Sequence, residues 1–197
     1  MKIGVLALQG DFAEHIQILK KIGIETIEVR LPEHLKGLDG LIIPGGESTT
    51  MGKLAFHYGL MEPIREFAGR KAVWGTCAGA ILLSKSAHRE QPLLNLMDIQ
   101  VERNAYGRQI ASFEIDLQVP ALQTVDPDER PYHAIFIRAP LIELMPGEAV
   151  ALAALPDGRI AAAQQGRWLA TAFHPELTED DRFHRFFVSL ADQANGN

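Results

Sequence analysis

The only cysteine of the chain, Cys77, lies between two glycines in the stretch GTCAG (75–79). The stretch has the form Gly-x-nucleophile-x-Gly. Between a strand and a helix this pattern is typical of a nucleophile elbow, whose strained backbone exposes the side chain above the sheet. The glycines let the two backbones pass close together, and the N–H groups of the following helix favour a thiolate. A buried structural cysteine explains these five residues equally well, because the pattern arises easily by chance.

A second candidate group lies in TAFHPE (171–176), where His174 and Glu176 are two residues apart. On an extended segment such residues point to the same side. The carboxylate could then accept one imidazole N–H and leave the other nitrogen to face a thiol. Alone, the pair could equally be two solvated groups at a strand end. A catalytic histidine is expected far from its cysteine in sequence, so the combination with Cys77 favours catalysis.

A third candidate is the turn in IIPGGEST (42–49), with Gly45 and Gly46 after an apolar strand. Backbone N–H groups in such a turn can stabilise an oxyanion, and the N–H of Ala78 would supply a second donor. Gly-Gly is a common turn and is weak evidence alone. Together with a thiol and a base, these donors indicate acyl transfer through a thioester.

The elements that must position these residues alternate through the first half of the chain. Apolar runs predict strands, and amphipathic runs between them predict helices, with Ser48 and Thr49 as candidate N-caps. The expected strands are 2–8, 25–30, one within 37–46 that ends at Pro44-Gly45-Gly46, and 71–76. The expected helices are 11–23, one or two over 48–69, and 77–86. This alternation predicts a mostly parallel sheet covered by helices on both faces. Ligand sites in such sheets lie at the carboxyl ends of the strands, where PGGES and GTCAG fall.

The second half contains short strand candidates separated by turn signals, followed by a closing helix at 180–193. We expect these strands to add antiparallel hairpins to the same sheet. Since no internal repeat or low-complexity linker interrupts the chain, residues 1–197 are predicted to form a single α/β domain. The polar segment 84–95 has no role that its sequence indicates.

Composition argues against several classes of function. The net charge of −6 without a basic run disfavours nucleic acid as a partner. No apolar run approaches the ~18 residues of a membrane span, and a single cysteine without an internal disulfide fits a cytoplasmic protein. Scattered histidines and a lone cysteine predict no metal site, and no cofactor is expected.

Three of these stretches, PGGEST, GTCAGAI and HPE, resemble the signatures of class I, triad-type glutamine amidotransferases. The segments LALQGDFAEH (6–15), MDIQVERNAYGRQIASFE (97–114) and FIRAP (136–140) are similar to those of the glutaminase subunits of pyridoxal 5′-phosphate synthases. The similarity runs from Met1 to the C-terminal helix. It implies a flavodoxin-like three-layer sandwich and the hydrolysis of L-glutamine to glutamate and ammonia.

The resemblance also implies a role for individual residues. Cys77 would attack the glutamine amide, with His174 as base and Glu176 orienting it, while the N–H groups of Gly46 and Ala78 hold the oxyanion. Further residues implied in the glutamine pocket are Gly46, Glu47, Ser48, Arg103, Ile137 and Arg138. Those implied beside the oxyanion loop and a partner interface are Gln9, Gly10 and Gly45.

The implied partner is a synthase subunit with a (β/α)8 barrel, which receives the ammonia for vitamin B6 synthesis in a large hetero-oligomer. Docking is implied to activate the glutaminase by completing the oxyanion hole at the Gly45–Gly46 peptide. One alternative is a glutaminase subunit of another amidotransferase, such as the histidine-pathway enzyme. Another is a non-catalytic binding or redox protein with an elbow cysteine, which would not need His174 and Glu176 in register with the thiol.

Overall fold

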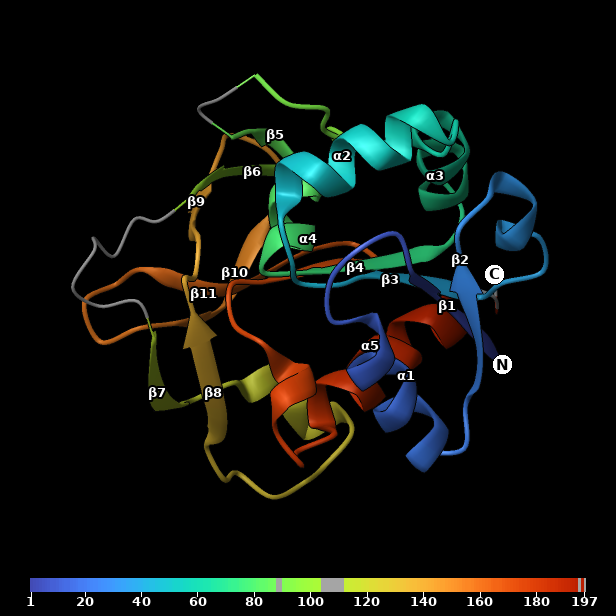
Figure 1. The fold of residues 1–197 in the computed structure, drawn as a ribbon. Coiled ribbons are helices and arrows are strands. Elements are labelled where there is room, and N and C mark those ends of the chain that lie inside the picture. Colours follow the sequence, from blue (N-terminus) through green and yellow to red (C-terminus); the bar gives the residue numbers. More distant parts are fainter. Residues whose placement is uncertain (88–89, 104–111, 195, 197) are drawn as a thin grey trace.

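The computed structural model describes residues 1–87, 90–103, 112–194 and 196, and a mixed sheet forms its centre (Figure 1). The strand order is β2-β1-β3-β4-β12-β11-β9-β6-β5, and β10 pairs with β11. The strands are β1 (Lys2–Leu6), β2 (Glu25–Val29), β3 (Gly40–Ile43), β4 (Ala72–Thr76), β5 (Ser84–Ser86), β6 (Met97–Glu102), β7 (Ser112–Leu117), β8 (Tyr132–Ile137), β9 (Leu141–Leu144), β10 (Val150–Ala154), β11 (Ile160–Gln165) and β12 (Trp168–Thr171).

Five neighbouring strands, from β2 through β1, β3 and β4 to β12, are parallel. Four of them come from the alternating first half, as predicted, whereas β12 comes from the second half, where antiparallel hairpins were expected. The helices are α1 (Phe12–Lys21), α2 (Ser48–His57), α3 (Met61–Ala68), α4 (Ala78–Leu83) and α5 (Arg182–Gln193), with short 3-10 turns at Pro32–Leu35, Pro120–Thr124 and Pro175–Leu177. In Figure 1, α2, α3 and α4 lie on one face of the sheet, and α1 and α5 lie on the other. The expected three-layer α/β architecture is therefore confirmed.

The stretch 48–69, predicted as one or two helices, forms two, because the chain turns at Gly59, whose φ is +67°. The first of these, α2, departs from prediction at its N-terminus. Its N-cap is Glu47, whose carboxylate accepts from the N–H groups of Thr49 and Thr50, so the expected caps Ser48 and Thr49 were wrong. A glutamate can cap this helix because its longer side chain folds back over the first turn.

The second half differs more. Residues 84–86, predicted as the end of a helix, form β5, and the unpredicted β9 lies between β6 and β11. The strands β7 and β8 pair with each other as a separate two-stranded sheet rather than extending the central one. Phe113 stacks on Phe136, and Phe136 packs against Phe173, so this hairpin covers the core beside the sheet.

The segment 84–95 connects several elements. Arg65 of α3 donates to the carbonyls of Leu93 and Leu94, and Gln91 accepts from the hydroxyls of Ser48 and Thr49 on α2. Positions 88 and 89 lie outside the described residues. The described part of the segment therefore ties the two helices above the sheet.

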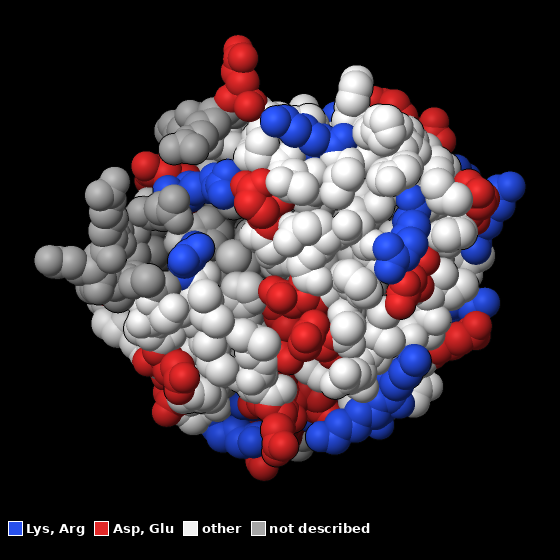
Figure 2. Space-filling model, in the orientation of Figure 1, with Lys and Arg blue, Asp and Glu red and all other residues white. Residues whose placement is uncertain are grey.

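The face drawn in Figure 2 carries acidic side chains in its centre and lower part, with basic ones scattered around them. This distribution agrees with the net charge of −6. Among the described helices, of which α5 with 12 residues is the longest, none has the length and apolar character to span a bilayer.

Candidate active site

Cys77 occupies a sharp turn between β4 and α4. Its φ of +48° and ψ of −102° lie outside the regions that L-residues ordinarily adopt. The turn requires both flanking glycines: a Cβ on Gly79 would lie 2.0 Å from the carbonyl oxygen of Ile43, and one on Gly75 would lie 2.4 Å from the backbone of Gly79. The strand–turn–helix context predicted for GTCAG is therefore present.

Parallel pairing of β4 with β12 brings the distant candidates together. Thr76 lies opposite Thr171 in the register, so the chain leaves both strands at the same edge of the sheet. The N–H of Cys77 donates to the carbonyl of Thr171 at 2.8 Å. His174 follows three residues later, on a turn rather than on the extended segment that we expected, since Pro175–Leu177 form a 3-10 helix.

His174 connects Cys77 to Glu176. Its Nδ1 lies 2.7 Å from Oε1 of Glu176, and both residues are about 95% buried. Burial alone would lower the pKa of His174, but hydrogen bonds to Cys77 and Glu176 and the charges of those groups raise it to about 10. Burial raises the pKa of Glu176, and the contact with His174 opposes that rise. The arrangement leaves Nε2 of His174 to face the thiol, which suits proton exchange with sulfur.

The Gly45–Gly46 turn is fastened to the loop after β1. The carbonyl of Gly45 accepts from the N–H of Asp11 at 3.2 Å, and the N–H of Glu47 donates to Oε1 of Gln9 at 2.7 Å. Gly10, with φ of +96°, makes this approach possible, because a Cβ there would lie 1.8 Å from the oxygen of Gly45. The orientation of the Gly45–Gly46 peptide therefore depends on the 9–11 loop.

A cavity of about 420 Å³ opens above these groups. It is lined by Gln9, Asp11, Gly46, Glu47, Ser48, Cys77, Ala78, Ile81, Arg103, Ile137, Arg138, Pro140 and His174. One cavity is thus lined by the residues predicted as nucleophile, base, oxyanion donors and glutamine pocket. Glu176 lies behind His174. Arg138 has φ of +45°, a second strained position on the same cavity wall. The part of VERNAYGRQ after Arg103 lies outside the described residues.

Glu47 and Arg103 form an ion pair at the cavity wall, with 2.7 Å between Oε1 and the guanidinium. Arg103 also donates to the hydroxyl of Thr49. Hydrogen bonds from the side chain and N–H of Thr50, aided by Thr49 and Arg103, lower the pKa of Glu47 to about 2, although burial opposes them. An adjacent anion and cation of this kind match the ammonium and carboxylate of an amino acid.

Sequence reasoning missed two residues near the triad. Asp11 was not among the predicted site residues, but its Oδ2 lies 3.7 Å from Nδ1 of His174 and its side chain lines the cavity. Asp11, His174 and Glu176 place ligand-type atoms within 4.8 Å of one another. Because Nδ1 carries the proton that Glu176 accepts, it has no lone pair for a metal. His15 was also missed, since a histidine on the apolar face of a helix is not distinctive.

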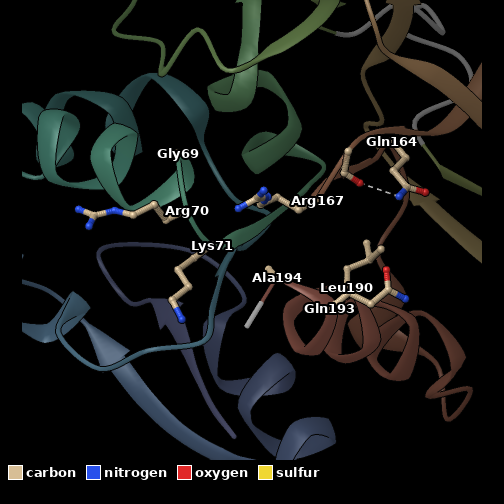
Figure 3. A pocket seen from close by; sticks show the side chains of 9 residues that line it. Gly69, Arg70, Lys71, Gln164, Arg167, Leu190, Gln193 and Ala194 are labelled. Atoms are coloured by element: carbon tan, nitrogen blue, oxygen red, sulfur yellow. Dashed lines mark hydrogen bonds between the residues drawn. The ribbon is translucent and has the colours of Figure 1, made fainter. Parts of the chain in front are cut away.

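A larger cavity of about 590 Å³ lies near the amino ends of β4 and β12, away from Cys77 (Figure 3). Arg70, Lys71 and Arg167 line it, beside the carboxyl ends of α3 and α5. Cations are favourable next to helix carboxyl ends, which accounts for these charges. None of the described residues lining it is a cysteine or a histidine, so this cavity is not the candidate active site.

Comparison with known proteins gives consistent results. The chain is 56% identical over 196 residues to the pyridoxal 5′-phosphate synthase subunit PdxT of Herpetosiphon aurantiacus, covering 96% of this chain and 100% of that protein. It is 51% identical over 194 residues to PdxT of a Roseiflexus species, with the same coverage. A crystal structure of a glutamine amidotransferase with 50% identity matches with a TM-score of 0.89, covering 96% of this chain and 98% of that one. The structure of PurLQS from Thermotoga maritima, 17% identical with a TM-score of 0.66 and covering 98% and 96%, shows the fold alone.

The fold is therefore that of the glutamine amidotransferases. The model of the SNO glutamine amidotransferase family matches residues 5–193. The chain belongs to this family.

Proposed function

We propose that this chain is the glutaminase subunit of a pyridoxal 5′-phosphate synthase, and that Cys77, His174 and Glu176 are its catalytic triad. The observation that carries the proposal is that Cys77 and His174 line one cavity sized for an amino acid, with Nδ1 of His174 2.7 Å from Glu176 behind it. The names of the relatives at 50–56% identity support the particular synthase.

In the first half-reaction, the thiolate of Cys77 forms a bond to the side-chain carbonyl carbon of glutamine. The negative charge that develops on the oxygen is held by the N–H groups of Gly46 and Ala78. The imidazolium of His174 gives its proton to the amide nitrogen, the C–N bond breaks, and ammonia leaves a glutamyl thioester.

In the second half-reaction, His174 takes a proton from water as the oxygen attacks the thioester carbon. The C–S bond then breaks, and glutamate and the Cys77 thiolate are formed. In both half-reactions Glu176 accepts a hydrogen bond from Nδ1–H of His174, so the imidazole keeps one orientation.

The substrate's charged end is assigned to the Glu47–Arg103 pair, its ammonium to the carboxylate and its carboxylate to the guanidinium. Ser48, Ile137 and Arg138 complete that pocket. We further propose that ammonia passes to a barrel-shaped synthase subunit. Docking of that subunit near Gln9, Gly10 and Gly45 would orient the Gly45–Gly46 peptide so that its N–H can bind the oxyanion. The orientation of this peptide depends on its contacts with the 9–11 loop, which docking would adjust.

The decisive experiment measures pyridoxal 5′-phosphate formation by the synthase subunit with glutamine or with an ammonium salt. We expect glutamine to support synthesis only when this chain is present, and ammonium to support it without the chain. C77S should abolish the glutamine-dependent reaction and leave the ammonium-dependent one unchanged. Glutamine-dependent synthesis by C77S would exclude the proposed nucleophile, and failure with ammonium would exclude the proposed division of labour.

A histidine-pathway glutaminase remains the competing assignment that the site chemistry alone allows. Pull-down with each candidate synthase separates the two, because only the true acceptor should bind and raise the rate of glutamine hydrolysis. A glutamine-analogue electrophile addresses the non-catalytic alternative. With the synthase present it should label Cys77, and it should label an H174A variant far more slowly.

A further inference from the structure

Behind Glu176 lie two fully buried histidines from opposite ends of the chain. His15 belongs to α1 and His184 to α5, and both helices lie on the face of the sheet away from α4 (Figure 1). Nδ1 of His15 lies 2.9 Å from Nε2 of His184. Both rings pack edge-on against the indole of Trp74, which fixes their planes.

The other edge of His15 faces the triad. Its Nε2 lies 3.3 Å from Oε2 of Glu176 and 3.3 Å from the hydroxyl oxygen of Thr76. Oε1 of Glu176 already accepts from His174, whereas Oε2 is buried and makes no hydrogen bond among the described residues, so the 3.3 Å approach of Nε2 of His15 is a contact rather than a formed hydrogen bond. A buried carboxylate oxygen without a donor is costly, so the nearest nitrogen should carry a proton.

This requirement determines both tautomers. If Nε2 of His15 carries the proton, Nδ1 is bare and must accept from Nε2–H of His184, and only a lone pair on Nδ1 of His184 is left unpaired. The opposite order would set a lone pair of His15 against the carboxylate and would bury an unpaired N–H on His184, whose Nδ1 has no partner among the described residues. The first order satisfies more of the buried groups.

We propose that His15, held in its Nε2–H tautomer by His184, is a positioning residue that donates to Oε2 of Glu176 and keeps this carboxylate ionised and oriented toward His174. The inference rests on the proposed catalytic triad. His184 then donates a hydrogen bond to His15, and His15 donates one to Oε2 of Glu176. The other oxygen of this carboxylate, Oε1, accepts the hydrogen bond from His174.

The groups around Glu176 make the hydrogen bond from His15 important for keeping the Glu176 carboxylate ionised. Glu176 is faced by His174 from its own turn, by Asp11 from the loop before α1, by Tyr132 from β8 and by His15 from α1. Burial raises the pKa of Glu176 and the charge of Asp11 adds to that rise, while His174 opposes it. Burial and the neighbouring histidines hold the pKa of His15 well below its usual range, so His15 donates as a neutral group.

The first test is the tautomeric state, read from the ¹⁵N chemical shifts of histidine-labelled protein at neutral pH. We expect a proton on Nε2 and none on Nδ1 in both His15 and His184, whereas His174, with its raised pKa, should carry protons on both nitrogens. A proton on Nδ1 of His15 would overturn the proposal whether or not the protein hydrolyses glutamine. This readout therefore separates failure of the inference from failure of the proposed function.

The second test compares H15Q with H15N in glutamine hydrolysis with the synthase subunit. The amide of glutamine reaches the position of Nε2, whereas that of asparagine reaches only the position of Nδ1. The acid limb of kcat should rise by about one pH unit in H15N and stay near wild type in H15Q, with KM little changed in both. L190A in α5 is the control for stability alone: it should lower the unfolding temperature and leave the acid limb in place. An unmoved acid limb in folded H15N, or equal shifts in both variants, would refute the positioning role.

Discussion

On His174, burial and local charge act in opposite directions. Burial disfavours the imidazolium, yet Cys77 on one side of the ring and Glu176 on the other raise its pKa to about 10. The residue therefore stays protonated at neutral pH. In the proposed mechanism this places the acid that protonates the leaving amide nitrogen next to the sulfur before substrate binds.

The contribution of the thiol can be measured by removing it. In C77A, His174 keeps the lowering effect of burial and the raising effect of Glu176 but loses the raising effect of Cys77. Its pKa should therefore fall clearly below about 10. An NMR titration of the imidazole resonances reports this value. His133 provides an internal control, because its raised pKa depends on Asp116 and Glu114 and should not change. An unchanged pKa of His174 would show that sulfur is not its partner.

Among the elements, the turn from β4 to α4 sets the position of the sulfur. The strained backbone of Cys77 is held by a hydrogen bond to Thr171 and by the tight approach of Gly79 to Ile43. The same approach is impossible for any residue with a Cβ. Helix α4 must therefore pack against β3 for Cys77 to adopt its position.

G79A is expected to destabilise the protein by about 1–3 kcal/mol, because the added methyl meets a backbone carbonyl that cannot move aside. G69A is the matched control: its φ of −57° is helical, and a Cβ there would meet nothing closer than 3.4 Å. Urea unfolding of both variants gives the comparison. Equal stabilities would mean that the packing of α4 on β3 is looser than these distances indicate.

Sequence alone predicted the elements whose signal is local. The parallel strands β1, β3 and β4 are apolar runs that end in turns, and the residues after them were placed correctly at one sheet edge. The strands β5 and β9 were missed because three or four residues carry no readable period, and their pairing depends on neighbours. The strands β7 and β8 have six residues each and were among the predicted strands, but their pairing as a separate sheet was missed, because pairing depends on neighbours distant in sequence.

The candidate site shows a similar division. Cys77, His174 and the Gly45–Gly46 turn have recognisable residue types and spacings. His15 and Asp11 do not, since their proximity to the triad arises from how α1 packs across the sheet. The turn at Pro175–Leu177 was also beyond prediction, because an extended segment and a 3-10 turn can both bring a carboxylate to an imidazole two residues away.

For the molecule as a whole, His15 and His184 join α1 to α5 and so tie the first helix to the last. Burial lowers the pKa of His184 to about 3, and burial together with His184 and His174 lowers that of His15. Both are neutral when folded. In the unfolded chain both histidines have the ordinary pKa of about 6.5 and bind protons below that pH. The stability that the two neutral histidines provide is therefore complete above a pH of about 6.5 and is lost as the pH falls toward about 3.

In H184Q one of these proton-binding sites is absent, and the amide can still donate to His15. Between pH 6 and 4, the loss of unfolding free energy per pH unit should be smaller than in wild type by about 1.4 kcal/mol, the value for one proton. Urea unfolding at several pH values measures the slope. L190A, which is destabilised but retains both histidines, should keep the wild-type slope. The same slope in H184Q would show that His184 is not neutral in the fold.

The strand order also has a consequence for synthesis of the chain. The edge of β4 pairs with β12, which is translated roughly ninety residues later and takes about 5 to 20 s to appear at common elongation rates. During that interval β4 is an unprotected edge strand, and the Cys77 N–H lacks its Thr171 acceptor. Until β12 has been synthesised, the nascent chain thus exposes an unpaired strand edge directly beside Cys77.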